Sequence, residues 1–98
     1  MFARLTKFQI KIDKIDKGAE LYKNSVVPAI KSEKGCQKIY LLIDPKTGKG
    51  VSIILWDSEE DVIANEESGL YQEQLVKFLG FLTEQSYIRE GYEVKVQA

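Results

Sequence analysis

The chain has 98 residues, of which 44% are hydrophobic, and its 14 basic and 15 acidic side chains leave a net charge of −1. This length and composition predict one folded domain over residues 1–98 and exclude a disordered chain, and the near-neutral balance argues against a nucleic-acid or membrane-surface partner. One cysteine excludes an internal disulfide, and a sequence without histidine lacks the usual transition-metal sites and every histidine-dependent triad, so we expect no metal site.

The first predicted element is a strand over residues 2–12, in which Phe8, Ile10 and Ile12 alternate with polar residues. A helix follows, because apolar residues recur at steps of three and four, namely Ile15, Ala19, Tyr22, Val26 and Ile30. Pro28 lies late in this helix, where its missing N–H predicts a kink or a break with a short second piece.

A hairpin comes next. Its two strands are predicted over residues 36–44 and 50–56, and Pro45 and Gly48 lie in the turn between them. Proline presets φ and glycine permits positive φ, so this spacing is typical of a tight turn.

The last third of the chain predicts a helix in two pieces and a strand. Ser58 is expected to cap the first piece, and Gly69 interrupts the pattern before a second piece over residues 70–82. A final strand is predicted over residues 86–96 from the alternation of apolar and charged side chains.

This β-α-β-β-α-β order predicts an α+β, ferredoxin-like fold, with a four-stranded antiparallel sheet and the helices on one face. The two strands of the hairpin are apolar at nearly every position, so both faces of the sheet require burial although the helices cover only one. We therefore expect a homodimer that packs sheet against sheet. The alternative is a monomer whose connections fold back over the sheet.

The net charge conceals a division between the two halves of the chain. Residues 1–49 carry a charge of +6 and residues 50–98 carry −7. We interpret this contrast as charge complementarity between the first and second helices, rather than as a surface for a charged partner. The sequence also shows neither a signal-peptide pattern nor an apolar stretch of membrane-spanning length, so a cytoplasmic location is expected.

Several motifs resemble the antibiotic-biosynthesis-monooxygenase-like group of the dimeric α/β-barrel superfamily. The similarity covers nearly the whole chain and rests on five segments: Val27-Pro28-Ala29, Gly35, Asp44 with Thr47-Gly48-Lys49-Gly50, Trp56-Asp57-Ser58-Glu59-Glu60, and Leu70-Tyr71. The resemblance implies a homodimeric barrel with a pocket in each subunit between sheet and helices. Some members of this group oxidise aromatic polyketides with dioxygen and no cofactor.

A related branch degrades haem with a histidine and with an asparagine near the start of the first strand. This sequence has no histidine, and its first strand has no asparagine, so haem degradation of that kind is not expected. Trp56 does match a tryptophan shared by several enzymatic members of the group.

The candidate catalytic residues are Trp56 and Arg89. The indole of Trp56 offers a flat apolar face and an N–H donor, although it can equally be a core residue. Arg89 and Arg4 can hold an ionised substrate group through bidentate contacts, or can be solvated strand residues. The further candidates for ligand binding are Tyr22, Asn65, Tyr71 and Phe78, beside Tyr87 as a hydrogen-bond donor.

Each of these residues also has a purely structural interpretation. Tyr22 and Tyr71 fall on predicted inner stripes, and Asn65 is expected to be a helix cap. Cys36 is expected to be a small buried hydrophobic residue. The four carboxylates at positions 59, 60, 66 and 67 are expected to form a solvated helix face.

Two functions fit these features. The first is a cofactor-independent monooxygenase that acts on a small aromatic or polyketide-like substrate in an apolar pocket. The alternative is a non-catalytic homodimer that binds a small apolar ligand or a protein partner. A well-formed pocket favours a ligand, whereas a pocket filled by Trp56, Tyr71 and Phe78 favours a scaffold.

Overall fold

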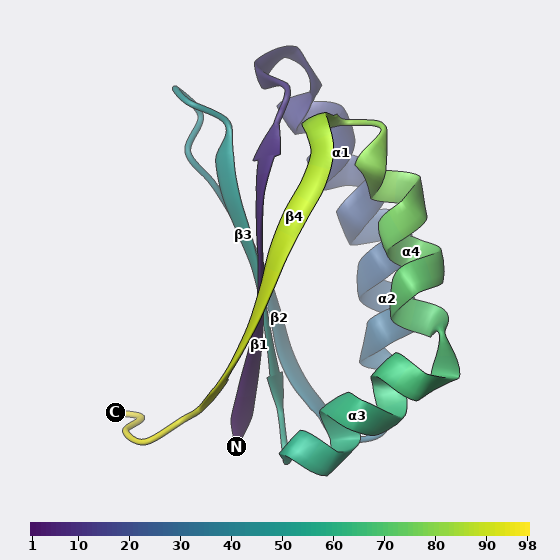
Figure 1. Cartoon of the computed structure of the whole chain (residues 1–98), viewed down its shortest axis with the longest axis vertical. Coiled ribbons are helices and arrows are strands. Elements are labelled where there is room, and N and C mark those ends of the chain that lie inside the picture. The colour runs from purple at the N-terminus through teal and green to yellow at the C-terminus, as the bar shows by residue number, and fades with distance from the viewer.

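The computed structural model describes residues 1–84 and 87–98, and its four strands form one antiparallel sheet with the helices on one face (Figure 1). The order across the sheet is β2-β3-β1-β4, so the two terminal strands are neighbours. This arrangement confirms the predicted α+β, ferredoxin-like fold. The strand bounds are β1 Phe2–Ile10, β2 Cys36–Ile43, β3 Lys49–Trp56 and β4 Leu82–Glu93.

The helical segments form two lengths of chain, one after β1 and one after β3. The first contains a 3-10 helix at Ile12–Lys14, α1 at Ile15–Leu21, a π-helix at Tyr22–Val26 and α2 at Val27–Lys31. The second contains α3 at Glu59–Ser68 and α4 at Leu70–Leu79. Ser58 caps α3 as predicted, because its hydroxyl accepts a hydrogen bond from the Asp61 backbone N–H, and Gly69 ends α3 in the left-handed conformation (φ 77°).

The irregularity predicted at Pro28 takes the form of the π-helix that separates α1 from α2. Pro28 is the second residue of α2, so the carbonyl four residues earlier belongs to the π-helix. The proline ring would clash with that carbonyl in a regular α-helix, and the wider turn relieves the clash. Tyr22 is the first residue of this π-helix.

Three predicted boundaries are wrong. Ile12 lies outside β1 and is 58% exposed, because the chain turns there into the 3-10 helix. Leu82 belongs to β4 instead of the preceding helix, where it pairs with Ile10 and is buried. The last strand also ends at Glu93, and Val96, expected within it, is exposed.

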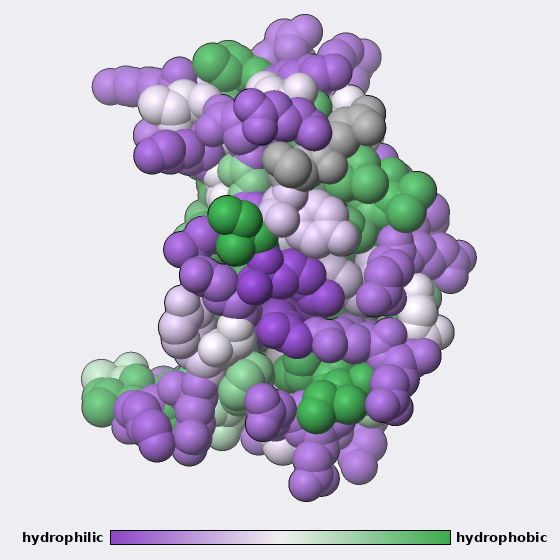
Figure 2. Space-filling model, viewed as in Figure 1, coloured by the Kyte–Doolittle hydropathy of each residue, from purple (hydrophilic) through white to green (hydrophobic). Residues whose placement is uncertain are grey.

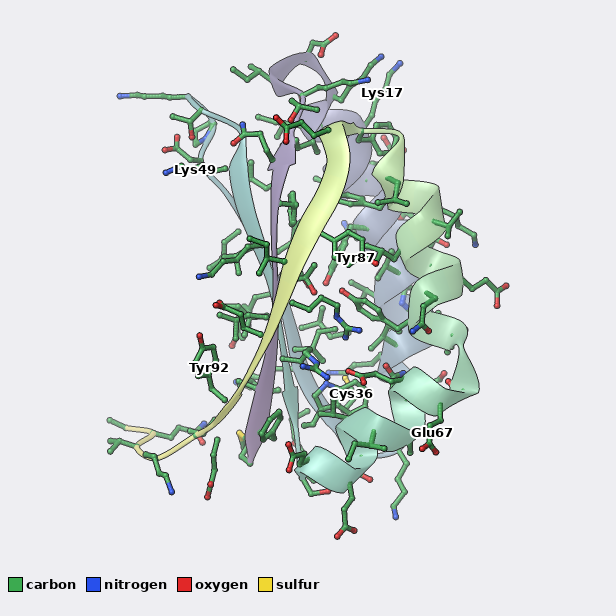
Figure 3. All side chains as sticks on the ribbon, in the orientation of Figure 1. Lys17, Cys36, Lys49, Glu67, Tyr87 and Tyr92 are labelled. Carbon is green, nitrogen blue, oxygen red and sulfur yellow. The ribbon has the colours of Figure 1, made fainter. Side chains whose placement is uncertain are left out.

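The core lies between the sheet and the helices. Its fully buried side chains include Ile10, Ile30, Ile54, Trp56, Val62 and Leu82. The strand residues that face it alternate with residues on the opposite face, which no helix covers. Figure 3 shows this alternation in β4, where Tyr87 points toward the helices and Tyr92 points to the other side.

The uncovered face is apolar and concave. Cross-strand pairing brings Leu5 and Tyr40 to either side of Ile53, and Leu42 beside Val51. An open groove of about 840 Å³ follows this face. Tyr40 and Leu42 remain 44% and 49% exposed, a degree of exposure that a second covering layer would remove.

The interpretation of the charge division as helix-to-helix pairing is wrong. Among residues 1–84 and 87–98, the ion pairs that join the basic half to the acidic half start from β1: Arg4 with Glu66 and Lys7 with Glu90. None of the ion pairs in this part of the chain joins α1 or α2 to α3 or α4. The opposite charges of the two halves therefore form ion pairs between β1 and residues of the acidic half.

Candidate functional site

Four hydroxyl groups meet between the sheet and the helices. Thr6 of β1 and Ser52 of β3 are direct cross-strand partners, and both are buried. The Tyr71 hydroxyl from α4 lies 2.7 Å from Thr6 Oγ1, and the Tyr22 hydroxyl from the π-helix lies 2.5 Å from Ser52 Oγ. Each tyrosine therefore reaches one of two adjacent strand hydroxyls, and the pairs lie side by side.

These hydroxyls line a small, partly open cavity whose other walls are apolar. The cavity measures about 20 Å³, which is enough for one water-sized molecule. Phe78 lines it and makes edge-to-face contacts with Phe8 and with Tyr22, at centroid distances of 5.3 and 6.0 Å. The lining residues are Thr6, Phe8, Tyr22, Val26, Ser52, Tyr71, Leu75 and Phe78.

Burial keeps both tyrosines neutral. Removal from water raises the pKa of Tyr22 far above its ordinary value, and the hydrogen bond to Ser52 offsets this only in part. Burial also raises the pKa of Tyr71, against the opposing effects of the Thr6 hydrogen bond and of the nearby Arg89 charge. Both side chains can therefore donate a proton in a hydrogen bond at neutral pH.

A cluster of two arginines and one carboxylate adjoins this cavity. Arg4 of β1 donates from Nη2 to Glu66 Oε1 of α3, and Arg89 of β4 places its Nη2 3.4 Å from the same oxygen. The Arg89 guanidinium carbon also lies 4.1 Å from the centre of the Tyr71 ring, a cation–π contact. Tyr71 is thus shared by the cavity wall and the arginine cluster.

The cluster is mostly but not completely buried. The side chains of Arg4, Arg89 and Glu66 are 21%, 20% and 29% exposed. The visible face in Figure 2 carries a strongly hydrophilic patch near its centre, beside the β4 edge of the sheet. The cluster therefore connects the polar surface at this edge with the tyrosines inside.

Trp56 lies at one end of the sheet, apart from the cavity lining. It is 1% exposed and pairs across the sheet with Phe2 and with Cys36. Its indole N–H is buried and has no hydrogen-bond partner in the described part of the chain. The arginine Nε groups of the cluster share this property, so this side of the sheet carries three buried donors without a protein acceptor.

The structure brings together some of the predicted site residues and separates others. Tyr22, Tyr71 and Phe78 line one cavity, and Arg4 and Arg89 share one carboxylate. Asn65 is a buried residue of α3 whose amide donates to Glu33 Oε1 at 3.3 Å, so it joins α3 to the segment after α2 and does not cap the helix.

Three residues of the site were not predicted as such. Thr6 fits the ordinary alternation of a strand, so nothing in the sequence identified it as a residue of the site. Ser52 is the single polar residue in an otherwise apolar run from Val51 to Trp56, which was the one available signal, although the pattern does not specify that the hydroxyl faces the core. The prediction that Glu66 belongs to a solvated helix face is wrong, because two arginines bind its carboxylate.

Cys36 is half-buried, and burial raises the pKa of its thiol. Within residues 1–84 and 87–98, no group of histidine, cysteine, aspartate or glutamate side chains is arranged to hold a metal ion. In the same residues, no helix combines the length and the apolar character needed to cross a membrane.

Similarity to known proteins agrees with this architecture. The chain is 34% identical over 64 residues to the uncharacterised protein Rv2557 of Mycobacterium tuberculosis, an alignment that covers 65% of this chain. The chain spans only 29% of the length of that relative.

Solved structures of low sequence identity share the fold. A monooxygenase from the gene ActVA-Orf6 of Streptomyces coelicolor, in complex with nanaomycin D, superimposes with a TM-score of 0.83 at 14% identity, covering 99% of this chain and 89% of that one. SnoaB, a cofactor-independent oxygenase from Streptomyces nogalater, superimposes with a TM-score of 0.79 at 7% identity, covering 98% and 94%. The family model described as antibiotic biosynthesis monooxygenase matches residues 1–74. The chain therefore belongs to the antibiotic biosynthesis monooxygenase family.

Proposed function

We propose that this protein is a cofactor-independent monooxygenase that acts on a small aromatic phenol or a polyketide-like substrate between the sheet and the helices. The observation that carries the proposal is the pair of buried tyrosine hydroxyls in an otherwise apolar cavity, with a guanidinium stacked on one of the tyrosine rings. Membership of the family and the oxygenase activities named for two structural neighbours support it.

The reaction needs a substrate that itself supplies the electrons. An electron-rich phenol reacts with dioxygen to give a quinone and water. One oxygen atom forms a new bond to a ring carbon, and the other leaves as water with the displaced ring hydrogen and the phenol hydrogen. The substrate is oxidised and dioxygen is reduced, so neither a metal nor a flavin is required for the balance.

Each polar group of the site has a role in this chemistry. Arg89 stabilises the phenolate, because a fixed positive charge in a largely dry site favours the anion that donates electrons. Tyr22 and Tyr71 donate hydrogen bonds to the substrate oxygens and orient the ring. Trp56 is buried and lies apart from the cavity lining, so it has no contact with the substrate in this proposal and supports the end of the sheet.

The protein acts as a homodimer in this proposal. The concave face that carries Leu5, Tyr40, Leu42 and Ile53 packs against the same face of a second copy. Lys7, one of the charged residues on this face, is already paired, since its Nζ lies 2.8 Å from Glu90 Oε1. The Glu90 carboxylate raises the pKa of Lys7, and Lys7 in turn lowers the pKa of Glu90.

Oxygen consumption tests the activity. The purified protein, treated with a chelator, is mixed with hydroxynaphthalenes, dihydroxynaphthalenes and anthrone, and oxygen uptake is compared with quinone formation. Uptake equal to the quinone formed is expected, with a loss of about tenfold or more in Tyr71→Phe and in Arg89→Ala. Tyr40→Phe is the matched control because that ring lies on the other face. No turnover with any of these phenols would contradict the proposal.

One observation favours the alternative of a non-catalytic homodimer that binds a small ligand. The cavity of about 20 Å³ has room for one water-sized molecule, which is far less than an aromatic substrate needs. A protein that forms the dimer and binds naphthols without consuming oxygen would have this second function.

A further inference from the structure

The two arginines of the chain converge on one place. Arg4 and Arg89 are the only arginines in the sequence, and they lie on the neighbouring strands β1 and β4. Arg4 pairs with Gly91, and Thr6 pairs with Arg89, so both arginines lie on the helix-facing side in diagonal positions. Such positions allow two long side chains to meet.

Gly91 leaves the space that Arg4 occupies. A Cβ at this position would lie 3.1 Å from Arg4 Nη1 and 2.9 Å from the Phe2 ring, so the guanidinium passes over a strand residue without a side chain. A glycine inside a strand weakens it and marks a close approach of other groups. Here two groups approach, the Phe2 ring and the Arg4 guanidinium, and the missing side chain of Gly91 leaves room for both.

The cluster has more positive charge and more donors than Glu66 satisfies. Two guanidinium groups and one carboxylate leave a local charge of +1. Glu66 uses a single oxygen for the Nη2 atoms of both arginines, and the Nε–H groups of both are buried without a hydrogen-bond partner in the described residues. A planar carboxylate binds a guanidinium best through two parallel contacts, and each buried Nε–H can supply one of them beside the Nη2 group that contacts Glu66.

We propose that Arg4 and Arg89 bind the carboxylate of an aromatic ligand next to Glu66. One added monoanion neutralises the cluster and gives the Nε–H groups their acceptors. The aromatic part of the ligand extends toward Tyr71, which borders both the cluster and the cavity. This inference rests on the ligand site of the proposed function and assigns an anionic class of ligand to it.

Nitrogen–proton correlation NMR tests the contact directly, because only two arginine Nε–H signals exist in this chain. The probe is 1-naphthoate, and 1-naphthamide is its neutral isostere. Both Nε–H signals are expected to shift on titration with 1-naphthoate, and the amide is expected to bind about tenfold more weakly. Unmoved Nε–H signals, or equal binding of the amide, would overturn the proposal.

Two glutamates on the same helix provide a matched pair of variants. Glu66→Gln removes the competing charge and is expected to tighten 1-naphthoate binding about fivefold. Glu67→Gln makes the same change on an exposed side chain that points away from the sheet (Figure 3), and is expected to leave the affinity within about twofold. Equal affinities of the two variants would refute a role of the cluster.

Arg89→Lys keeps the positive charge but loses the planar fork, so the affinity is expected to fall about tenfold. If this variant does not fold, the two glutamate variants still test the proposal.

Binding is measured without dioxygen, so the affinity does not depend on turnover. Binding of 1-naphthoate at the arginines without oxygen uptake would support this site and contradict the oxygenase. Turnover of neutral phenols without any arginine shift would contradict this site alone.

Discussion

Thr6 and Ser52 are direct cross-strand partners, and each holds the hydroxyl of a different tyrosine. The sheet register therefore fixes the separation of Tyr22 and Tyr71, although one comes from the π-helix and the other from α4. The π-helix and α4 are therefore aligned with each other, because their tyrosines bind neighbouring hydroxyls on the sheet. The result is a cavity wall with two neutral hydroxyl donors, which can form hydrogen bonds with the oxygens of a phenol.

The hydroxyl pairs are expected to contribute to stability as well as to function. Tyr22→Phe should lower the free energy of unfolding by about 1–2 kcal/mol, because it leaves the buried Ser52 hydroxyl without its partner. Ser52→Ala added to Tyr22→Phe should cost less than the sum of the single changes. Urea unfolding of the parent, the two single variants and the double variant measures this coupling. Strictly additive free-energy changes would contradict it.

Alkaline pH should destabilise the protein through the same tyrosines. Their pKa values are raised in the folded state, so above about pH 10 the unfolded chain loses protons that the folded chain retains. The unfolded state then binds fewer protons, and stability falls as pH rises, by up to about 1.4 kcal/mol per pH unit for each tyrosine.

Urea unfolding across this alkaline range checks the prediction. Tyr22→Phe combined with Tyr71→Phe should flatten the slope, and Tyr92→Phe, at an exposed tyrosine of β4, should leave it unchanged. Burial also raises the pKa of Cys36, which adds a slope common to all these variants. A double variant as sensitive to pH as the parent would be inconsistent with buried neutral tyrosines.

Two glycines should respond in opposite ways to alanine. A Cβ at Gly18 would lie 2.7 Å from Ile10 Cδ1 and 3.3 Å from the Phe78 ring, so Gly18→Ala should cost about 1–3 kcal/mol despite the better helix propensity of alanine. Gly80 has open space around it and a helical φ of −62°, so Gly80→Ala should be neutral or slightly stabilising. Thermal unfolding compares the two, and equal melting temperatures would argue against a tight helix–core contact at Gly18.

The uncovered sheet face should control assembly. Leu42→Glu introduces a charge on this face and is expected to convert the proposed dimer to monomer, raising the dissociation constant at least about tenfold. Ile63 of α3 has a similar exposure of 47% against 49% for Leu42, so Ile63→Glu is the control and should remain dimeric. Sedimentation equilibrium measures both, and loss of the dimer in both variants alike would speak against a specific interface.

The sequence alone was sufficient for the fold because its patterns were local. Alternation along the strands, the Pro45–Gly48 turn, the Ser58 cap and the Gly69 break all depend on residues within a few positions of one another. The start of the last strand was harder to predict, because Leu82 fits the apolar stripe of the preceding helix as well as it fits a strand. Its pairing with Ile10, more than 70 positions earlier, decides between them.

The site was only partly predictable for the same reason. The inward stripes identified Tyr22 and Tyr71, but their partners depend on the register between β1 and β3, which no local pattern specifies. Glu66 belongs to a run of carboxylates that is typical of a solvated helix face. Its carboxylate is buried against Arg4 and Arg89 only when α3 packs over the neighbouring strands β1 and β4.

The central claim is that dioxygen reacts with a substrate held by the buried hydroxyls and Arg89. Incubation of the chelator-treated protein and anthrone with isotopically labelled dioxygen, followed by mass spectrometry of the product, tests it most directly. We predict one labelled oxygen atom in each quinone formed by the parent protein and by Tyr40→Phe, at a rate that falls about tenfold or more in Tyr71→Phe. Quinone formed no faster than without protein, or without label, would contradict the account.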